Sequence, residues 1–223
     1  MPTAADHRLT AAYENKPDNY YSSARKDFLA LLPDNSKAAI LELGCGEGPT
    51  GALALKQGKC AEYVGIELMP EAAAAARLVL TRVIYGDVER TALDLPTAHF
   101  DALIISEVLE HLINPWDTLQ NLGTYLKPGA LVLASSPNVA HWKIVRQLIN
   151  GRFDLTDAGI MDRTHLRWFT PATYAALFEK SGYTVERVWP ITTIPASKRL
   201  LATLIGGRHH LFYKQICIAA RKS

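Results

Sequence analysis

The segment from Ile40 to Gly48 constrains the fold of this chain more than any other. It reads Ile-Leu-Glu-Leu-Gly-Cys-Gly-Glu-Gly, an apolar run that leads into glycines at alternate positions. Glycine lets the backbone turn sharply and approach a ligand more closely than a Cβ would permit. A helical stretch over 49–57 follows, and the next apolar run, 63–67, ends in the acid Glu67. This order of strand, glycine loop, helix, strand and acid predicts a nucleotide-binding βαβ unit.

The glycine spacing separates two nucleotide chemistries. A dinucleotide fold needs Gly-x-Gly-x-x-Gly, whose last glycine allows tight helix–strand packing below a pyrophosphate. Here Pro49 takes that position and the third glycine falls one residue earlier, at Gly48. The segment 42–48 instead resembles motif I of the class I S-adenosylmethionine (SAM)-dependent methyltransferases, whose ligand has no pyrophosphate. A nicotinamide-dependent dehydrogenase and a glycine turn that binds nothing are the alternatives.

Apolar runs and helical stretches continue to alternate as far as Ser136. Strands alternating with helices predict a parallel sheet with right-handed crossovers. Further along, Thr170 and Pro171 are typical of a helix start, and Gly182 of a helix end. Strands are expected over 82–85, 100–106, 130–135, 183–189 and 213–220, and helices over 22–32, 71–80, 115–126 and 171–181. The resemblance implies an α/β, Rossmann-like, doubly wound sheet of seven strands, mostly parallel with an antiparallel last strand and helices on both faces.

The organisation that we predict is a single methyltransferase domain over residues 1–223. Residues 1–33 would form an N-terminal helical lid and 34–136 the SAM-binding core. Residues 137–169 would form a substrate-facing insertion, as the resemblance implies, and 170–223 the C-terminal helix and strands. The resemblance covers about residues 35–190.

Composition indicates an ordinary soluble globular protein, with 48% hydrophobic and 21% charged residues. A net charge of +2 gives no argument for a nucleic-acid or membrane partner. Cys45, Cys60 and Cys217 are odd in number and lack metal-type spacing, which favours a reduced, cytoplasmic compartment. The start of the chain does not fit a signal peptide, and no apolar stretch approaches the roughly 20 residues of a membrane helix. We expect a small-molecule partner; the sequence gives no oligomeric state.

Cofactor-binding residues follow from the resemblance and from the sheet. Ligands of open α/β sheets bind at the carboxyl ends of the strands. The resemblance implies that Glu67 accepts hydrogen bonds from both ribose hydroxyls and Asp87 from the adenine amino group, while the Val88 N–H serves a ring nitrogen. A turn aspartate is the alternative for Asp87. The expected set is Glu42, Gly44, Cys45, Gly46, Gly48, Glu67, Leu68, Asp87, Val88, Ser106 and Glu107.

The motif from Ser106 to His111 is the second distinctive feature. On a helical turn Glu107, Glu110 and His111 would share a face, and two carboxylates with an imidazole could bind a divalent cation. The motif resembles the Glu-x-x-Glu-His of bacterial ubiquinone-pathway O-methyltransferases, where it supports a metal. Many other class I members carry Glu-x-x-x-His without one. Since no further ligand follows at evident spacing, we predict no metal, with these three residues as the alternative site.

A third motif, 159–170, contains Asp162, His165 and Arg167. With the stretch from Ser136, it resembles bacterial methyltransferases found alongside glycosyltransferases in surface-polysaccharide gene clusters. Their Asp-x-Thr-His-x-Arg pattern is present, although Trp168 replaces the usual phenylalanine. Aromatic side chains exclude water and hold neutral acceptors. We therefore predict a lid or pocket wall that contains Tyr20, Tyr21, Trp142, Phe153 and Trp168, with ordinary packing as the alternative. The expected substrate-binding residues are Tyr20, Tyr21, Trp142 and Arg167, of which the arginine could instead be a solvated surface charge.

The function that we predict is methyl transfer from SAM to a small-molecule acceptor, which leaves S-adenosylhomocysteine (SAH). The acceptor group expected is a hydroxyl of a sugar or related metabolite. A hydroxyl needs a base, and His165 is the first candidate with His111 as its competitor. Either histidine could instead be structural, bonded to Asp162 or Glu110. A non-catalytic SAM-binding scaffold or sensor is the alternative from another functional class.

Overall fold

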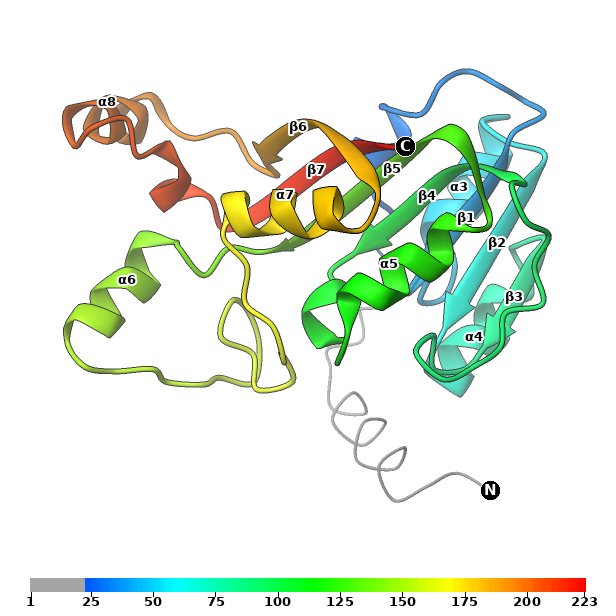
Figure 1. The fold of residues 1–223 in the computed structure, drawn as a ribbon, viewed down its shortest axis with the longest axis horizontal. Helices are drawn as coiled ribbons and strands as arrows, with labels where there is room; N and C mark the ends of the chain where they lie inside the picture. Colours follow the sequence, from blue (N-terminus) through cyan, green and yellow to red (C-terminus); the bar gives the residue numbers. More distant parts are fainter. Residues whose placement is uncertain (1–22) are drawn as a thin grey trace. The chain divides into compact units, whose positions relative to one another are not determined.

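The computed structural model describes residues 23–223, which form a seven-stranded sheet with the strand order β3-β2-β1-β4-β5-β7-β6 (Figure 1). The strands are β1 (Ala39–Leu43), β2 (Glu62–Glu67), β3 (Arg82–Tyr85), β4 (Phe100–Ser106), β5 (Leu126–Pro137), β6 (Tyr183–Pro190) and β7 (Gln215–Lys222). β1 pairs in parallel with β2 and β4, β2 pairs in parallel with β3, and β6 pairs antiparallel with β7. The predicted Rossmann-like sheet, mostly parallel with an antiparallel last strand, is confirmed.

Helices connect these strands. They are α2 (Lys26–Leu29), α3 (Pro49–Lys56), α4 (Pro70–Ala76), α5 (Pro115–Gly123), α6 (Trp142–Ile149), α7 (Pro171–Lys180) and α8 (Ala196–Leu204), with the 3₁₀ turns η1 (Leu109–His111) and η2 (His209–Phe212). The chain divides into two compact units. The first contains residues up to 105 together with 124–131, and the second contains 106–123 and 132–223. The segment boundaries expected at 33, 136 and 169 stay a prediction.

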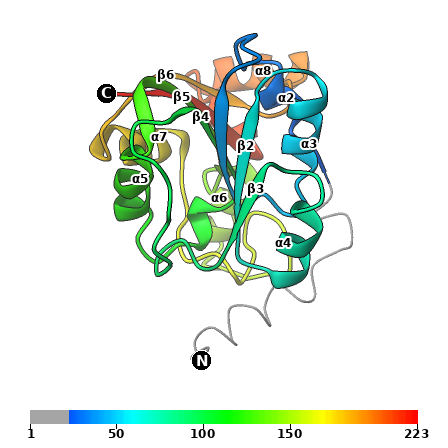
Figure 2. The ribbon, with the colours of Figure 1, turned by 90° about the vertical axis from the view of Figure 1, so that its right-hand side faces the viewer.

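In the first unit, α3 and α4 pack against the strands of the βαβ unit (Figure 2). Every residue of β1 is buried, including Glu42, as its otherwise apolar sequence predicts for a strand covered on both faces. The approach of α3 to β2 is close, because a Cβ on Gly51 would overlap the ring of Tyr63. In α4 the buried residues are the alanines 72, 73 and 76, whose small side chains allow a similarly close approach.

In the second unit, α7 packs against β6, β7 and α5. Its start is a capping box in which the Thr170 hydroxyl accepts from the Thr173 N–H and the Thr173 hydroxyl accepts from the Thr170 N–H. The helix buries Tyr174, Leu177 and Phe178 at helical spacing, as predicted. On β6, the Tyr183 hydroxyl donates a 2.6 Å hydrogen bond to the Leu119 carbonyl of α5.

Some elements differ from those predicted. The first helix is shorter, and the expected turn at 127–129 lies inside β5, which begins at Leu126. Pairing along the sheet therefore outweighs the turn preference of Pro128 and Gly129. α8 and η2 occupy a connection for which no helix was predicted. No helix among the described residues combines the length and the apolar character that crossing a membrane requires.

Candidate cofactor and acceptor site

The glycine loop and Glu67 form one hydrogen-bonded unit at the carboxyl ends of β1 and β2. The Glu67 carboxylate accepts 2.8 Å hydrogen bonds from the Gly46 N–H through Oε2 and from the Met69 N–H through Oε1. The Gly44 N–H donates to the Ile66 carbonyl at 2.8 Å. Gly44, Gly46 and Gly48 have φ values of 72°, 55° and 84°, which other residues rarely adopt. The loop conformation thus requires these glycines and fixes the acid in one orientation.

The Glu67 carboxylate retains capacity to accept further hydrogen bonds. Each carboxylate oxygen has about two lone-pair sites, and one site on each is used by the backbone. Burial raises the pKa of Glu67, against the opposing effect of the Met69 and Gly46 N–H groups. Hydroxyl groups donating to the charged form would lower the pKa again. A vicinal diol such as that of ribose offers two such donors, so the donor and acceptor chemistry fits SAM.

Glu42 is buried behind the loop. Its side chain accepts a 2.9 Å hydrogen bond from the Tyr63 hydroxyl, and 3% of the residue is exposed. Burial, with a smaller contribution from the charge of Glu67, raises the pKa of Glu42 to about 8. Tyr63 was not identified from the sequence, because one tyrosine in an apolar strand carries no signal that it faces an acid.

Gly65 of β2 lies against the loop. A Cβ on this residue would overlap the Sγ of Cys45, which is 3% exposed. The small side chain of Cys45 therefore suits the close packing between the strand and the loop. The glycine at 65 was not recognised as part of the site, although a glycine within a strand is a signal of close approach.

Asp87 and Val88, expected at the adenine, are half-buried after β3. Asp87 accepts a 2.9 Å hydrogen bond from the Glu89 N–H and lies 3.4 Å from Arg90 Nε. The aspartate therefore forms the turn that was its alternative interpretation, and its role toward adenine stays a prediction. Leu68, also expected at the cofactor, is half-buried.

Ser106 is the last residue of β4 and Glu107 follows it; both are half-buried. Glu107 has a φ of 55°, and its N–H donates a 3.1 Å hydrogen bond to the Ser135 carbonyl. Such a backbone conformation is uncommon for a residue other than glycine and occurs often at functional sites. The expectation of one helical turn through Glu107 is wrong, since η1 begins at Leu109.

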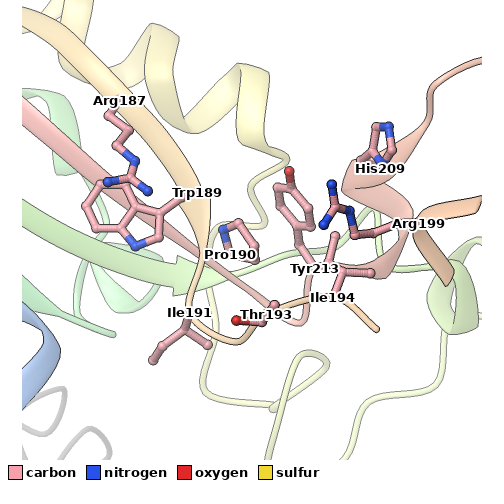
Figure 3. Close-up of a pocket in the computed structure, with 9 residues that line it drawn as sticks. All are labelled: Arg187, Trp189, Pro190, Ile191, Thr193, Ile194, Arg199, His209 and Tyr213. Atoms are coloured by element: carbon pink, nitrogen blue, oxygen red, sulfur yellow. The ribbon is translucent and has the colours of Figure 1, made fainter. Parts of the chain in front are cut away.

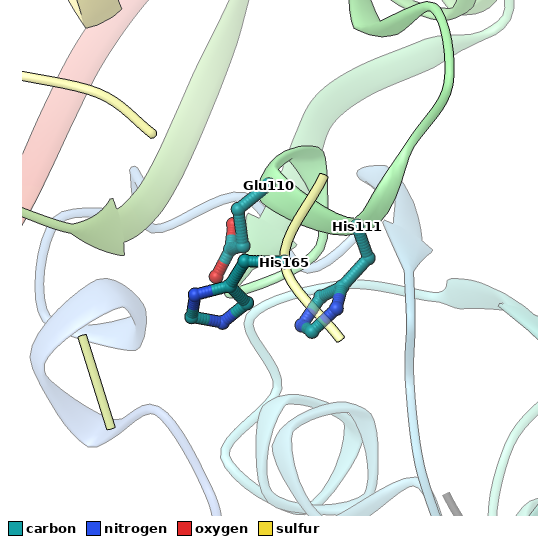
Figure 4. A group of neighbouring side chains, drawn as sticks. All are labelled: Glu110, His111 and His165. Atoms are coloured by element: carbon teal, nitrogen blue, oxygen red, sulfur yellow. The ribbon is translucent and has the colours of Figure 1, made fainter. Parts of the chain in front are cut away.

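The second unit brings Glu110, His111 and His165 together (Figure 4). One potential ligand atom from each lies within 4.8 Å of the others, and the two imidazole centroids are 4.7 Å apart. The Leu166 and Arg167 N–H groups both donate to the Glu110 carbonyl, at 2.8 and 2.9 Å. Glu107, a member of the alternative metal set, is not in this cluster. His165 takes its place, and the sequence analysis missed this because the histidine comes from a distant segment.

The hydrogen bonds of the two histidines define their tautomers. His165 Nδ1 lies 3.1 Å from the Ile160 carbonyl, and His111 Nδ1 lies 3.2 Å from the Thr164 carbonyl. Because a carbonyl only accepts, each Nδ1 must carry a proton, so the lone pair of the neutral ring is on Nε2. Asp162, the expected partner of His165, instead accepts from the Thr164 N–H and hydroxyl.

Glu110 is 1% exposed. Its Oε2 accepts a 3.2 Å hydrogen bond from the Ser136 hydroxyl, and its Oε1 has no hydrogen-bond partner in residues 23–223. Burial raises the pKa of Glu110 well above its usual range, and the charge of Glu107 raises it further. A buried carboxyl of this kind is stable when neutral or when a cation compensates it. The cluster can therefore support proton transfer or hold a cation.

The residues expected at the acceptor have varied surroundings. Trp142 is half-buried at the start of α6. Phe153 and Trp168 form an edge-to-face pair with centroids 5.4 Å apart. Arg167 donates to the carbonyls of Ile113 and Leu166, so it has structural partners as well as its predicted role. Tyr20 and Tyr21 lie outside the described residues.

A mostly parallel seven-stranded sheet whose first βαβ unit ends in a glycine loop and an anchored acid defines the Rossmann-like class of nucleotide-binding domains. A family model described as a methyltransferase domain matches residues 15–188. The chain therefore belongs to the class I SAM-dependent methyltransferase family, as the loop sequence predicted.

Relatives with assigned names include two methyltransferases. Trans-aconitate 2-methyltransferase of Azoarcus sp. is 29% identical over 137 residues, which cover 61% of this chain and 52% of that protein. Ubiquinone biosynthesis O-methyltransferase of Xylella fastidiosa is 28% identical over 178 residues, 78% of this chain and 72% of that protein. The match to the first relative thus spans about half of its length.

Among solved structures, a SAM-dependent methyltransferase from Archaeoglobus fulgidus has a TM-score of 0.64 at 19% identity. That match covers 92% of this chain and 97% of the solved chain. A likeness at this level of identity shows a shared fold.

Proposed function

We propose that this chain transfers a methyl group from SAM to a hydroxyl of a small-molecule acceptor. The observation that carries the proposal is the Glu67 carboxylate, held by the Gly46 and Met69 N–H groups beside a loop of three positive-φ glycines. Membership of the methyltransferase family supports the same reaction. When bound, SAM supplies an electrophilic methyl group, so the protein has mainly to align the acceptor and remove its proton.

The cofactor would be held by residues of the first unit. Glu67 would accept from the ribose hydroxyls, while the glycines let the loop backbone approach the ligand. Asp87 and Val88 would serve the adenine, and the hydrogen bond from the Glu89 N–H holds the Asp87 side chain within this turn. Glu42 would act through the buried hydrogen bond with Tyr63, which supports the loop from behind.

Proton removal is assigned to His165, with His111 as the competing candidate. Both rings donate through Nδ1 to a carbonyl, so Nε2 is the basic nitrogen of each neutral ring. The buried Glu110 beside them would interact favourably with an imidazolium once the proton has moved. A sugar or related hydroxyl is the acceptor class that we propose. The named relatives add polycarboxylates and quinone precursors to the compounds worth testing.

Cofactor binding can be tested by titration calorimetry with SAM and SAH. We expect Glu67→Gln and Asp87→Asn each to weaken binding by about tenfold or more, the usual effect of losing a hydrogen bond to a charged group. Glu179→Gln, an exposed acid at the end of α7, is the matched control and should bind as the wild type does. Undetectable binding of SAM and SAH by the wild type would overturn the proposal, and tighter binding of NADH would favour a dehydrogenase.

Catalysis can be tested by measuring SAH formation with a panel of a nucleotide sugar, a catechol and trans-aconitate. For the acceptor that turns over, His165→Ala should lower kcat by about 10²–10⁴-fold while SAH affinity stays within twofold. An equal loss in His111→Ala alone would move the role of base to His111. SAM binding without turnover of any hydroxyl acceptor would instead favour the scaffold or sensor.

A divalent cation is the second possibility for the Glu110–His111–His165 cluster. Two imidazoles and a carboxylate within 4.8 Å suit a first-row transition metal, and the cation would compensate the buried carboxyl. Metal analysis of the purified protein and turnover after EDTA treatment distinguish the roles. Full activity without bound metal supports a histidine base acting alone. Loss of activity that returns only on adding one cation supports a metal.

A further inference from the structure

The end of β6 and the connection from β6 to β7 line an open pocket of about 700 Å³ (Figure 3). Small-molecule sites have volumes of about 300–1,000 Å³, so the pocket has the size for an organic ligand. Its polar and aromatic lining consists of Arg187, Trp189, Thr193, Arg199, His209 and Tyr213. All of its lining residues belong to the second unit, and none belongs to the glycine loop or the Glu110–His111–His165 cluster.

The residues that line the pocket come from a segment that contains lysines and arginines but no acids. Residues 187–214 contain five lysines and arginines and no aspartate or glutamate, whereas the net charge of the whole chain is +2. The rest of the chain therefore carries a net charge of −3. The acid just before the segment, Glu186, forms its ion pair with Arg221 of β7. An anion entering the pocket would meet cations without a competing carboxylate from the segment itself.

The two arginines of the pocket come from different elements. Arg187 is on β6, and its guanidinium lies over the Trp189 ring, 4.9 Å from the ring centroid. Arg199 is on α8, near Tyr213 in Figure 3. Within residues 23–223, neither guanidinium forms an ion pair with a carboxylate. Guanidinium groups bind phosphate oxygens through two parallel hydrogen bonds, and stacking on an aromatic ring holds them in a fixed plane.

The lysines of this region also lie near the buried His141. Burial lowers the pKa of His141, and the charges of Lys143, Lys214 and Lys198 lower it further. Lys198 and Lys214 belong to the acid-free segment, so their field extends to a neighbouring side chain.

From this geometry we propose that the pocket binds an organic phosphate of the nucleoside diphosphate class. Arg187 and Arg199 lie on opposite sides of the pocket in Figure 3, so Arg199 would hold the phosphate oxygens beside the Tyr213 ring. Arg187, over Trp189, would donate to the acceptor atoms of the base at the other end of the ligand. The pocket volume exceeds what a single inorganic phosphate needs. The proposal is independent of methyl transfer, because it assigns no role to SAM or to either histidine of the cluster.

An anionic membrane surface is the competing partner for this segment. Leu200, Leu201, Leu204 and Ile205 of the α8 region are 64%, 49%, 75% and 39% exposed. A membrane, however, would contact the outside of α8, whereas Arg187 on β6 and Arg199 line a hollow. The arrangement of the cations therefore favours a small ligand.

The proposal can be tested by calorimetric titration with uridine diphosphate at 150 mM NaCl. Inorganic phosphate and uridine serve as separate probes for the two parts of the ligand. We expect uridine diphosphate to bind more tightly than either probe, and Arg187→Gln and Arg199→Gln each to weaken it by about tenfold or more. Arg77→Gln, an exposed arginine after α4 in the first unit, is the matched control and should leave the affinity unchanged.

Two further measurements separate this site from others. Uridine diphosphate should bind Glu67→Gln as tightly as the wild type, since the proposal places the ligand away from the cofactor residues; loss in that variant would overturn the proposal. Equal affinity in Arg187→Gln, Arg199→Gln and the wild type would also overturn it. Sedimentation with phosphatidylglycerol vesicles tests the membrane alternative: binding that Leu204→Asn abolishes, together with no binding of uridine diphosphate, would replace the small ligand with a lipid surface.

Discussion

At the scale of single residues, Glu42 is the carboxyl whose environment has the clearest consequence for stability. Burial raises its pKa to about 8 from a usual value near 4.5, against the opposing effect of the hydrogen bond from the Tyr63 hydroxyl. The native state therefore binds this proton more tightly than the unfolded state does. The stabilisation is complete below pH 4.5, decreases as the pH rises, and is lost once the pH passes about 8.

The prediction concerns the difference in unfolding free energy between the wild type and Glu42→Gln. Glutamine keeps an acceptor for the Tyr63 hydroxyl but does not titrate. Its contribution to the unfolding free energy therefore does not depend on pH. Subtracting the unfolding free energy of the variant from that of the wild type cancels the other titrating groups. We expect this difference to fall steadily between pH 5 and 8 and to stay level above pH 8.5, measured by urea denaturation. A difference that does not change with pH would show that Glu42 is ionised in the folded protein.

The sequence could predict some residues of the site and not others. Glu67 and the glycines were predictable because their spacing along one βαβ unit fixes their positions in space. The position of His165 beside Glu110 depends on the path of the chain between residues 111 and 165, which no local pattern specifies. The same holds for Tyr63, whose partner Glu42 lies on the neighbouring strand.

At the scale of elements, the packing of β2 against the glycine loop depends on the missing side chain at Gly65. Gly65 does not have the positive φ that favours glycine. An alanine at this position would therefore change the packing through its Cβ without straining the backbone. This Cβ would overlap Cys45 and press on Leu80. We expect Gly65→Ala to lower the unfolding free energy by about 1–3 kcal/mol, the usual cost of overpacking, and to weaken SAH binding.

A double-mutant cycle provides the control for this prediction. Cys45→Ala removes the Sγ atom that the new methyl group would meet, so the double variant should be less destabilised than the sum of the single variants. Unfolding free energies and SAH dissociation constants of the four proteins are the measurements. Additive effects would show that the cost of the alanine arises elsewhere than at Cys45.

The start of α7 depends on its capping box. Thr170→Ala removes the acceptor for the Thr173 N–H, and such losses usually cost about 1 kcal/mol, within a range of 0.5–2. Thr192→Ala, an exposed threonine outside any helix or strand, is the matched control and should change the unfolding free energy by less than about 0.5 kcal/mol. If both variants have the same stability, the capping hydrogen bonds contribute nothing net.

Elements with a buried face were predictable from the sequence, and elements without one were not. β1 and β4 are mostly apolar and α7 is apolar at helical spacing, because each packs on the core. α8 was missed because Ala202 is its only buried residue and its leucines are largely exposed, so they do not mark a core-facing stripe. Its start after Pro195 and its end before Gly206 were the available signals.

At the scale of the whole molecule, charge and chemistry are unevenly distributed along the chain. The glycine loop and its acids belong to the first unit, whereas the histidine cluster and the acid-free segment belong to the second. A net charge of +2 conceals this difference, because five cations in one segment offset an acidic remainder. Average composition therefore could not predict the pocket between β6 and β7, although a local count of acids and bases would have indicated it.

Ligand binding should change the stability of the whole molecule by mass action. A ligand that binds only the folded state at 100 times its dissociation constant adds about 2.7 kcal/mol to the unfolding free energy. We expect SAH at this ratio to raise the melting temperature of the wild type by several degrees, about 2–4 °C per kcal/mol for a chain of this size. Glu67→Gln should show a markedly smaller rise at the same SAH concentration, because it retains less affinity, and Glu179→Gln should match the wild type.

Hydrogen exchange can show which part of the chain SAH contacts. The N–H groups of Gly46 and Met69 donate to Glu67, so closure of SAH over this carboxylate should slow exchange in peptides that contain the loop 44–48 and residues 67–69. Peptides from α7, whose hydrogen bonds involve no cofactor residue, report whether protection reflects local contact or global stabilisation. A rise in melting temperature with equal protection everywhere would indicate stabilisation through the global equilibrium alone. A rise with no protection of the loop would mean that SAH binds elsewhere on the chain, and would remove Glu67 from the proposed site.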